Sequence, residues 1–144
     1  MPIDLEFVHH GVGVLYLCHD ALTGGELSEA NERLLASPDQ VRGLRFALVD
    51  LRRVTSLEAT TDELRSFATQ DRRIAAYAST GLLVAVVAEE LLGYGLTRMW
   101  QAFADGIGWE TEVFRSGAAA EAWVRVTLKE KFDVELTTES KLLP

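Results

Sequence analysis

The side chains best suited to chemistry are acidic residues that follow two apolar runs. Asp50 closes the run 46–49, and Glu89 and Glu90 follow the run 82–88. Apolar runs of this length without alternation are typical of strands covered on both faces. Because the carboxyl ends of parallel strands meet at one edge of a sheet, where ligands of open α/β sheets commonly bind, we expect a functional crevice at this edge.

Thr60 adds a hydroxyl group near the same edge. It is followed by Glu63 and then Leu64, which is the pattern of a capping box, where hydroxyl and carboxylate bind the free amides of a helix start. Thr23 and Glu26 repeat the pattern. The sequence therefore predicts one helix that begins at Thr60 after a polar turn, and another that begins near Thr23.

The other reactive side chains form no catalytic or metal-binding pattern. His9 and His10 are neighbours on an expected strand, so their side chains point to opposite faces and cannot hold one ion together. The Gly-x-Gly segments 11–13 and 93–95 lack the context of a phosphate-binding loop. We therefore predict no metal, no cofactor and no catalytic residue, and an enzyme ranks third among the functions considered.

The elements that must position these residues alternate along the chain. Apolar periodicity predicts strands at 5–9, 12–18, 44–51, 82–88 and 109–113, and helices that begin at 23, 60, 90 and 116. The order is β-β-α-β-α-β-α-β-α. We expect a single α/β domain over residues 1–128, with a mostly parallel central sheet, an antiparallel edge hairpin and helices packed on the sheet. Residues 129–144 are expected to form a C-terminal tail.

Composition restricts the function further. The chain of 144 residues is 48% hydrophobic, enough for a core without metal or disulfide, and its single cysteine, Cys18, is expected to be a small buried hydrophobe in a reducing cytoplasm. The net charge of -8 argues against binding to nucleic acid or to anionic membranes, which both need cationic patches. No apolar run reaches the length of a membrane span.

Segment 46–64 resembles the central strand, loop and helix of STAS domains, the fold of bacterial anti-sigma factor antagonists, whose pattern is roughly L-D-L-S-x-V-x-x-I-D-S-S-G-L. The positions that match in kind are Val49, Asp50, Leu51, Val54, Thr55, Leu57 and Leu64. Glu58 stands at the acidic loop residue, Ala59 and Thr60 replace the paired serines, and Thr61 replaces the glycine. The resemblance implies a non-enzymatic regulatory or protein-interaction module of the bacterial cytoplasm, with a partner such as an anti-sigma factor or kinase.

The resemblance also implies roles for individual residues. Thr60 takes the place of the phosphoacceptor, although a helix cap, worth about 1 kcal/mol, explains the same residue without signalling. The helix dipole would favour a phosphate there, and the carboxylates of Glu58 and Asp62 would repel it. The residues expected on the face presented to a partner are Asp50, Glu58, Thr60, Asp62, Glu89 and Glu90.

An alternative function follows from the third helix. STAS folds are similar to the lipid-transfer domains of the CRAL-TRIO type, and this helix carries Arg98, Met99, Trp100 and Phe103. These four residues are candidates for the lining of a pocket that binds a small hydrophobic ligand or an acyl chain. The competing interpretation is a surface arginine whose stem covers core side chains.

Overall fold

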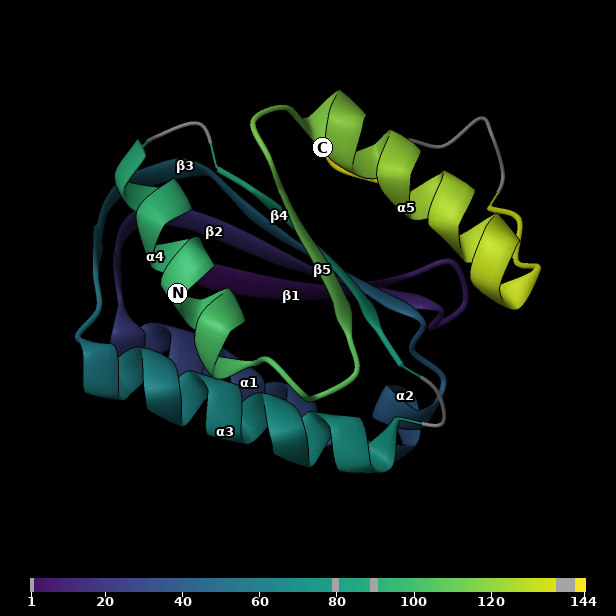
Figure 1. Ribbon diagram of the computed structural model, residues 1–144, viewed down its shortest axis with the longest axis horizontal. Helices are drawn as coiled ribbons and strands as arrows, with labels where there is room; N and C mark the ends of the chain where they lie inside the picture. The colour runs from purple at the N-terminus through teal and green to yellow at the C-terminus, as the bar shows by residue number, and fades with distance from the viewer. Residues whose placement is uncertain (1, 79–80, 89–90, 137–141) are drawn as a thin grey trace.

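The computed structural model describes residues 2–78, 81–88, 91–136 and 142–144, and a central sheet runs through it (Figure 1). In these ranges the strands are β1 Ile3–Val8, β2 Gly13–Thr23, β3 Phe46–Glu58, β4 Leu83–Val87 and β5 Glu110–Phe114. They lie side by side in sequence order. β1 is antiparallel to β2, and the other neighbours are parallel. The predicted α/β class, with an antiparallel hairpin at the edge of a parallel sheet, is confirmed.

The helices cover the two faces of the sheet unequally. α1 Gly24–Leu35, α2 Pro38–Arg42, α3 Thr61–Tyr77 and α4 Leu91–Phe103 connect successive strands, and α5 Gly117–Phe132 follows the last one. Right-handed crossovers between strands in sequence order place all the connecting helices on one face. Accordingly, α1 and α3 lie below the sheet in Figure 1, and α5 lies on the opposite side.

Alternation along the central strands builds one core on each face. Ala47 of β3 belongs to the cluster beneath α1, α2, α3 and α4, and Val49 packs against that cluster. Phe46 and Leu48 belong to the cluster beneath α5. β4 is buried along its whole length, as expected for a strand covered on both faces.

Both predicted capping boxes are present. The Thr60 hydroxyl accepts a hydrogen bond from the Glu63 amide at 3.1 Å, and a Glu63 carboxylate oxygen accepts one from the Thr60 amide at 2.8 Å. Thr23 and Glu26 form the same pair of bonds, at 3.3 and 3.0 Å. α3 and α1 therefore begin where the sequence pattern predicts.

The predicted polar turn between Asp50 and Thr60 is wrong, because β3 continues to Glu58. β2 is also longer than expected and runs alongside this extension, so that Thr23 pairs with Glu58. β4 pairs with β3 only as far as Asp50. The paired ends of β2 and β3 thus extend past the end of β4.

Two further expectations need correction. His9 and His10 lie in the turn after β1, with φ angles of 51° and 58°, and not on the strand. The expected boundary at Leu128 falls inside α5, which continues to Phe132.

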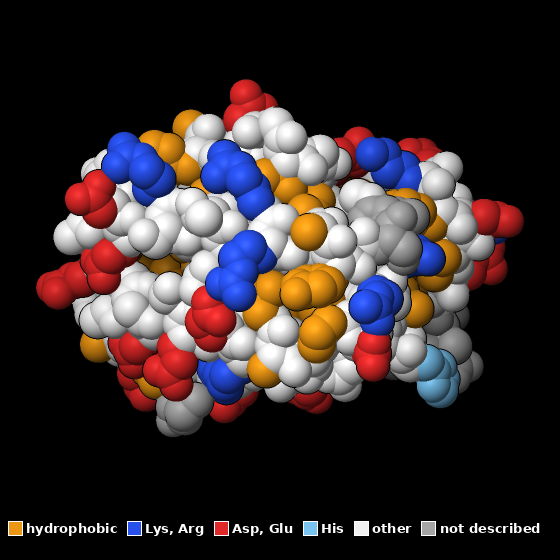
Figure 2. Space-filling model, turned by 90° about the horizontal axis from the view of Figure 1, so that it is seen from below, with side chains coloured by type: hydrophobic (Ala, Val, Ile, Leu, Met, Phe, Trp, Pro, Cys, Tyr) orange, Lys and Arg blue, Asp and Glu red, His pale blue; other side chains and the backbone are white. Residues whose placement is uncertain are grey.

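The C-terminal residues and the surface complete the description. Leu142 and Leu143 are buried in the cluster beneath α5. The side where α1 and α3 lie carries acidic and basic side chains interspersed with short hydrophobic patches (Figure 2). None of the helices in the described part of the chain has the length and apolar character needed to cross a membrane.

Candidate functional site

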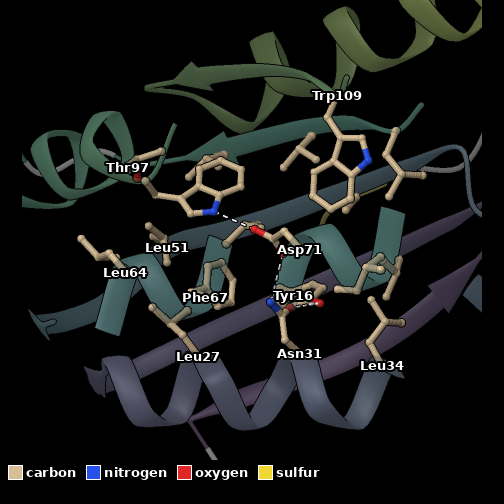
Figure 3. A pocket seen from close by; sticks show the side chains of 18 of the residues that line it. Tyr16, Leu27, Asn31, Leu34, Leu51, Leu64, Phe67, Asp71, Thr97 and Trp109 are labelled. Atoms are coloured by element: carbon tan, nitrogen blue, oxygen red, sulfur yellow. Dashed lines mark hydrogen bonds between the residues drawn. The ribbon is translucent and has the colours of Figure 1, made fainter. Parts of the chain in front are cut away.

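An apolar cavity lies between the sheet and the helices α1, α3 and α4 (Figure 3). About 80 Å³ of it is open to the centres of water-sized molecules. The walls come from β2, β3, β4, the three helices and the segment before β5, and include Leu27, Leu34, Val49, Leu51, Phe67 and Trp109. The rings of Phe67 and Trp100 meet in a tilted arrangement, with centroids 6.3 Å apart, and form part of the wall.

A chain of hydrogen bonds supplies the main polar groups of this cavity. The Trp100 indole N–H donates to Asp71 Oδ2 at 2.7 Å, and the Asn31 amide donates to Asp71 Oδ1 at 3.0 Å. The Tyr16 hydroxyl donates to Asn31 Oδ1 at 2.7 Å. Because the Tyr16 hydroxyl occupies the oxygen of the Asn31 amide, its NH₂ group is turned toward Asp71. Figure 3 shows the side chains of Tyr16, Asn31 and Asp71, from β2, α1 and α3, pointing toward one another.

Asp71 is a buried carboxyl group, 3% exposed. Burial raises its pKa to about 7 from 3.8, and the hydrogen bonds from Trp100 and Asn31 oppose the rise only in part. The ion pairs of the described residues do not include Asp71. The positive charge of nearby Arg72 also lowers the pKa of Asp71, less than these hydrogen bonds do, and its guanidinium donates to the Phe103 carbonyl at 2.8 Å.

Helical spacing explains why Asp71 and Asn31 face inward. Asp71 continues the buried stripe of α3 that Leu64, Ala68 and Ile74 form at intervals of three and four residues. Asn31 lies between Leu27 and Leu34 on the buried stripe of α1 in the same way. Neither Asp71 nor Asn31 is among the site residues that we predict from the sequence. A polar residue in phase with an apolar stripe is the signal that identifies both.

Asp50 is separated from the other described residues that are predicted for a partner face. Asp50 is only 4% exposed, and Arg52 binds its two carboxylate oxygens from Nε and a terminal guanidinium nitrogen, each at 2.9 Å. Arg52 approaches Gly117 at the start of α5, so this ion pair lies on the α5 face of the sheet. Asp50 therefore does not form part of an exposed surface.

Glu58, Thr60 and Asp62 are exposed, eight or more residues further along the chain than Asp50. At about 3.3 Å per strand residue, Asp50 and Glu58 are separated by roughly 26 Å. The Asp62 carboxylate pairs with Arg65 at 2.7 Å, and Thr60 is held in its capping box. Glu89 and Glu90 lie outside the described residues.

Of the four pocket candidates on α4, Trp100 lines the cavity. Phe103 is half-buried against the core of the same face, with the Arg65 guanidinium 5.0 Å from its ring centroid. Met99 is 39% exposed, and Arg98 is exposed with a hydrogen bond to Gln101 at 3.3 Å. Trp100 is thus the one of the four candidates that lines the cavity, together with Thr97 of the same helix.

In the part of the chain that the structure describes, no group of three or more histidine, cysteine, aspartate and glutamate side chains is placed to hold a metal ion. Cys18 is buried, as expected, and burial raises the pKa of its thiol to about 12. No family model, no curated protein and no solved structure matches the chain. The similarity to STAS domains therefore stays a prediction from the sequence.

Proposed function

We propose that this protein binds a small, mostly apolar molecule in the cavity between the sheet and α1, α3 and α4. The observation that carries the proposal is the combination of apolar walls with one convergent polar cluster, Tyr16, Asn31 and Asp71. Sites for small molecules are typically lined in this way, with few polar groups that fix the orientation of the ligand. The alternative function that we predict from the sequence, binding of a small hydrophobic ligand, is thus kept. The proposed site is the cavity and not the surface of α4 alone.

The size of the cavity limits the ligand. One water molecule needs roughly 10–15 Å³ of space for its centre, and the cavity offers about 80 Å³. A ring or a short branched chain is the group that fits. Leu51, Leu57 and Ala59 line the cavity and keep partial exposure, so a longer ligand would leave its remainder at this end.

The polar residues of the cavity favour binding over catalysis. Among the described residues that line it, the side chains with polar atoms are Tyr16, Asn31, Asp71, Thr97 and two tryptophans. Catalysis by a serine or cysteine nucleophile needs a base in hydrogen-bond reach, usually histidine, and the described lining contains none of these three residue types. We therefore propose a non-enzymatic role.

Native mass spectrometry of protein purified from cells tests the proposal. Wild-type protein is expected to carry a non-covalent ligand mass. Val49 faces the cavity and is only partly buried because of it. A Val49→Phe variant should fill the space and lose the ligand while remaining folded. Val126→Phe is the matched control, because Val126 lies on α5 with 56% of its surface exposed.

The opposite results would remove the proposal. A ligand mass that persists in Val49→Phe places the ligand elsewhere. A ligand that binds only the native state must raise Tm. If the wild-type protein carries no ligand mass, and if small aromatic compounds such as toluene do not raise its Tm, the cavity has no binding role.

A regulatory role at Thr60 is the second candidate, favoured by the exposure of Glu58, Thr60 and Asp62 near the extended ends of β2 and β3. In this proposal the exposed residues meet a protein partner, and phosphorylation of Thr60 breaks its capping box. The intact mass of the same purified protein tests it. A covalent phosphate that disappears in Thr60→Val supports the role, and phosphate at another residue or at none counts against it.

A further inference from the structure

Asp71 combines three properties that together define a chemical preference of the cavity. It lines the cavity, it is 3% exposed, and none of the ion pairs of the described residues involves it. Both of its hydrogen-bond donors, Trp100 and Asn31, are neutral. A buried carboxylate normally has a cationic partner, since neutral donors offset only part of the cost of removing its charge from water.

The carboxylate still has room for a ligand. Each Asp71 oxygen accepts one hydrogen bond, Oδ2 from Trp100 and Oδ1 from Asn31, and an ionised carboxylate has about four acceptor positions. The hydroxyl of Tyr16 holds the Asn31 amide in place and so is not itself directed at Asp71. Trp100 and Asn31 thus hold the Asp71 carboxylate in place. With one hydrogen bond to each oxygen from the described residues, the carboxylate can accept further hydrogen bonds from a ligand in the cavity.

We propose that the ligand is a small apolar amine, whose ring or chain fills the cavity and whose single protonated nitrogen binds the Asp71 carboxylate. This inference rests on the proposed function of the cavity and names the class of molecule that the cavity takes. The ammonium group supplies a cation in direct contact with the Asp71 carboxylate, which none of the ion pairs of the described residues provides, although the charge of Arg72 acts on Asp71 from nearby. Binding therefore completes a buried ion pair with hydrogen bonds on both oxygens.

The surroundings disfavour other head groups. The described lining residues include no lysine, arginine or histidine, so a carboxylate or phosphate head would meet Asp71 without compensation. A neutral hydroxyl would leave the buried charge unpaired. The net charge of -8 attracts cations to the molecule and repels anions.

Isothermal titration calorimetry with three probes of the same size tests the inference: benzylamine, benzyl alcohol and toluene, each at pH 8 and pH 5.5. At pH 8 benzylamine should bind at least tenfold more tightly than the two neutral probes. Burial places the pKa of Asp71 at about 7, so the carboxyl takes up a proton at pH 5.5. The affinity for benzylamine should then fall at least tenfold, and the affinity for toluene should not fall.

Asp71→Asn removes the charge and keeps the shape, so its preference for benzylamine over benzyl alcohol should disappear. Asp105→Asn is the matched control on an exposed aspartate and should keep the preference. Should Asp71→Asn fail to fold, the pH dependence of the wild-type protein decides the question.

The results separate the two proposals. Equal affinities for all three probes, or benzylamine binding that does not change between pH 8 and pH 5.5, would overturn the amine inference and leave the cavity as an apolar site. Absence of binding by all three probes would overturn the inference and the proposed function together.

Discussion

The carboxyl of Asp71 lies among leucine, valine and aromatic side chains, with hydrogen bonds from Trp100 and Asn31 as its compensation. The same cluster affects Tyr16, whose pKa is raised well above 10.0, first by burial and then by the nearby Asp71. Such a cluster costs stability when Asp71 ionises, and buried groups with shifted pKa values concentrate at functional sites.

The cost should be measurable as a pH dependence of stability. The pKa of Asp71 is about 7 in the folded protein and 3.8 as its ordinary value. The folded state thus holds the proton more tightly, and the stability from Asp71 is fully present below about pH 4 and is lost as the pH rises through about 7. The free energy of unfolding of wild type minus that of Asp71→Asn should therefore fall by a few kcal/mol (roughly 1.4 per pKa unit) between pH 4 and pH 8.

Urea denaturation of both proteins at several pH values checks this expectation. Taking the difference between them cancels the titration of the exposed carboxylates. A difference that stays constant from pH 4 to pH 8 would mean that Asp71 titrates normally, and it would also weaken the amine inference.

The capping box of Thr60 and Glu63 is a second contribution of single residues to stability. Its hydroxyl and the Glu63 carboxylate bind each other's amides. Thr60→Ala should therefore lower the free energy of unfolding by about 0.5–2 kcal/mol, and Thr60→Ser should change it little. Chemical denaturation measures both. Ser66→Ala, on an exposed position of the same helix, is the control and should stay within about 0.5 kcal/mol of wild type. Equal midpoints for wild type and Thr60→Ala would contradict the capping role.

At the scale of elements, the sequence predicts what depends on near neighbours. The two capping boxes involve residues three apart, and the buried strand β4 follows from one apolar run. The extension of β3 depends instead on the register with β2, where Thr23 pairs with Glu58. No signal within segment 50–60 reveals such a partner, which is why the sequence analysis predicts a turn there.

Dependence on distant residues also explains why Asp71 and Asn31 are not predicted as site residues from the sequence. Trp100 is predicted as a pocket residue from the sequence of its own helix alone. Asp71 receives its hydrogen bonds from Trp100, 29 residues away, and from Asn31, 40 residues away. The cavity exists only when α1, α3 and α4 pack together on the sheet. The sequence places Asn31 and Asp71 on the apolar stripes of their helices. Their hydrogen bonds form only when the helices pack together.

α5 and the C-terminal residues form the cover of the other sheet face, where the sequence analysis expected a tail. Leu142 and Leu143 are 3% and 4% exposed, and the Leu143 amide donates to a Glu121 carboxylate oxygen at 2.6 Å. Leu142→Ala and Leu143→Ala should each cost about 2–5 kcal/mol of stability, as do other buried leucines.

Thermal and urea unfolding of the two alanine variants check this prediction. Val126→Ala on the exposed side of α5 is the comparison and should be nearly neutral. Unfolding midpoints equal to that of the wild type would show that the C-terminal leucines are dispensable for this core.

For the molecule as a whole, the topology places the proposed binding cavity on one face of the sheet and α5 on the other. Strands in sequence order place α1, α3 and α4 on the same side, where a cavity lies between these helices and the sheet. The opposite side is covered by α5 and the C-terminal leucines.

The charge of the whole molecule leads to the last prediction. With a net charge of -8 and with both signs interspersed over α1 and α3 (Figure 2), the protein lacks the excess of cations that binds phosphates. Near 0.15 M salt, where the Debye length is about 8 Å, it should not bind duplex DNA or anionic liposomes, and lowering the salt should increase the repulsion. Fluorescence anisotropy with labelled DNA and co-sedimentation with liposomes measure this, with zwitterionic liposomes as the control. Tight binding to either anionic probe at this salt concentration would require a local basic surface that outweighs the net charge, and it would move the functional assignment away from a small cationic ligand.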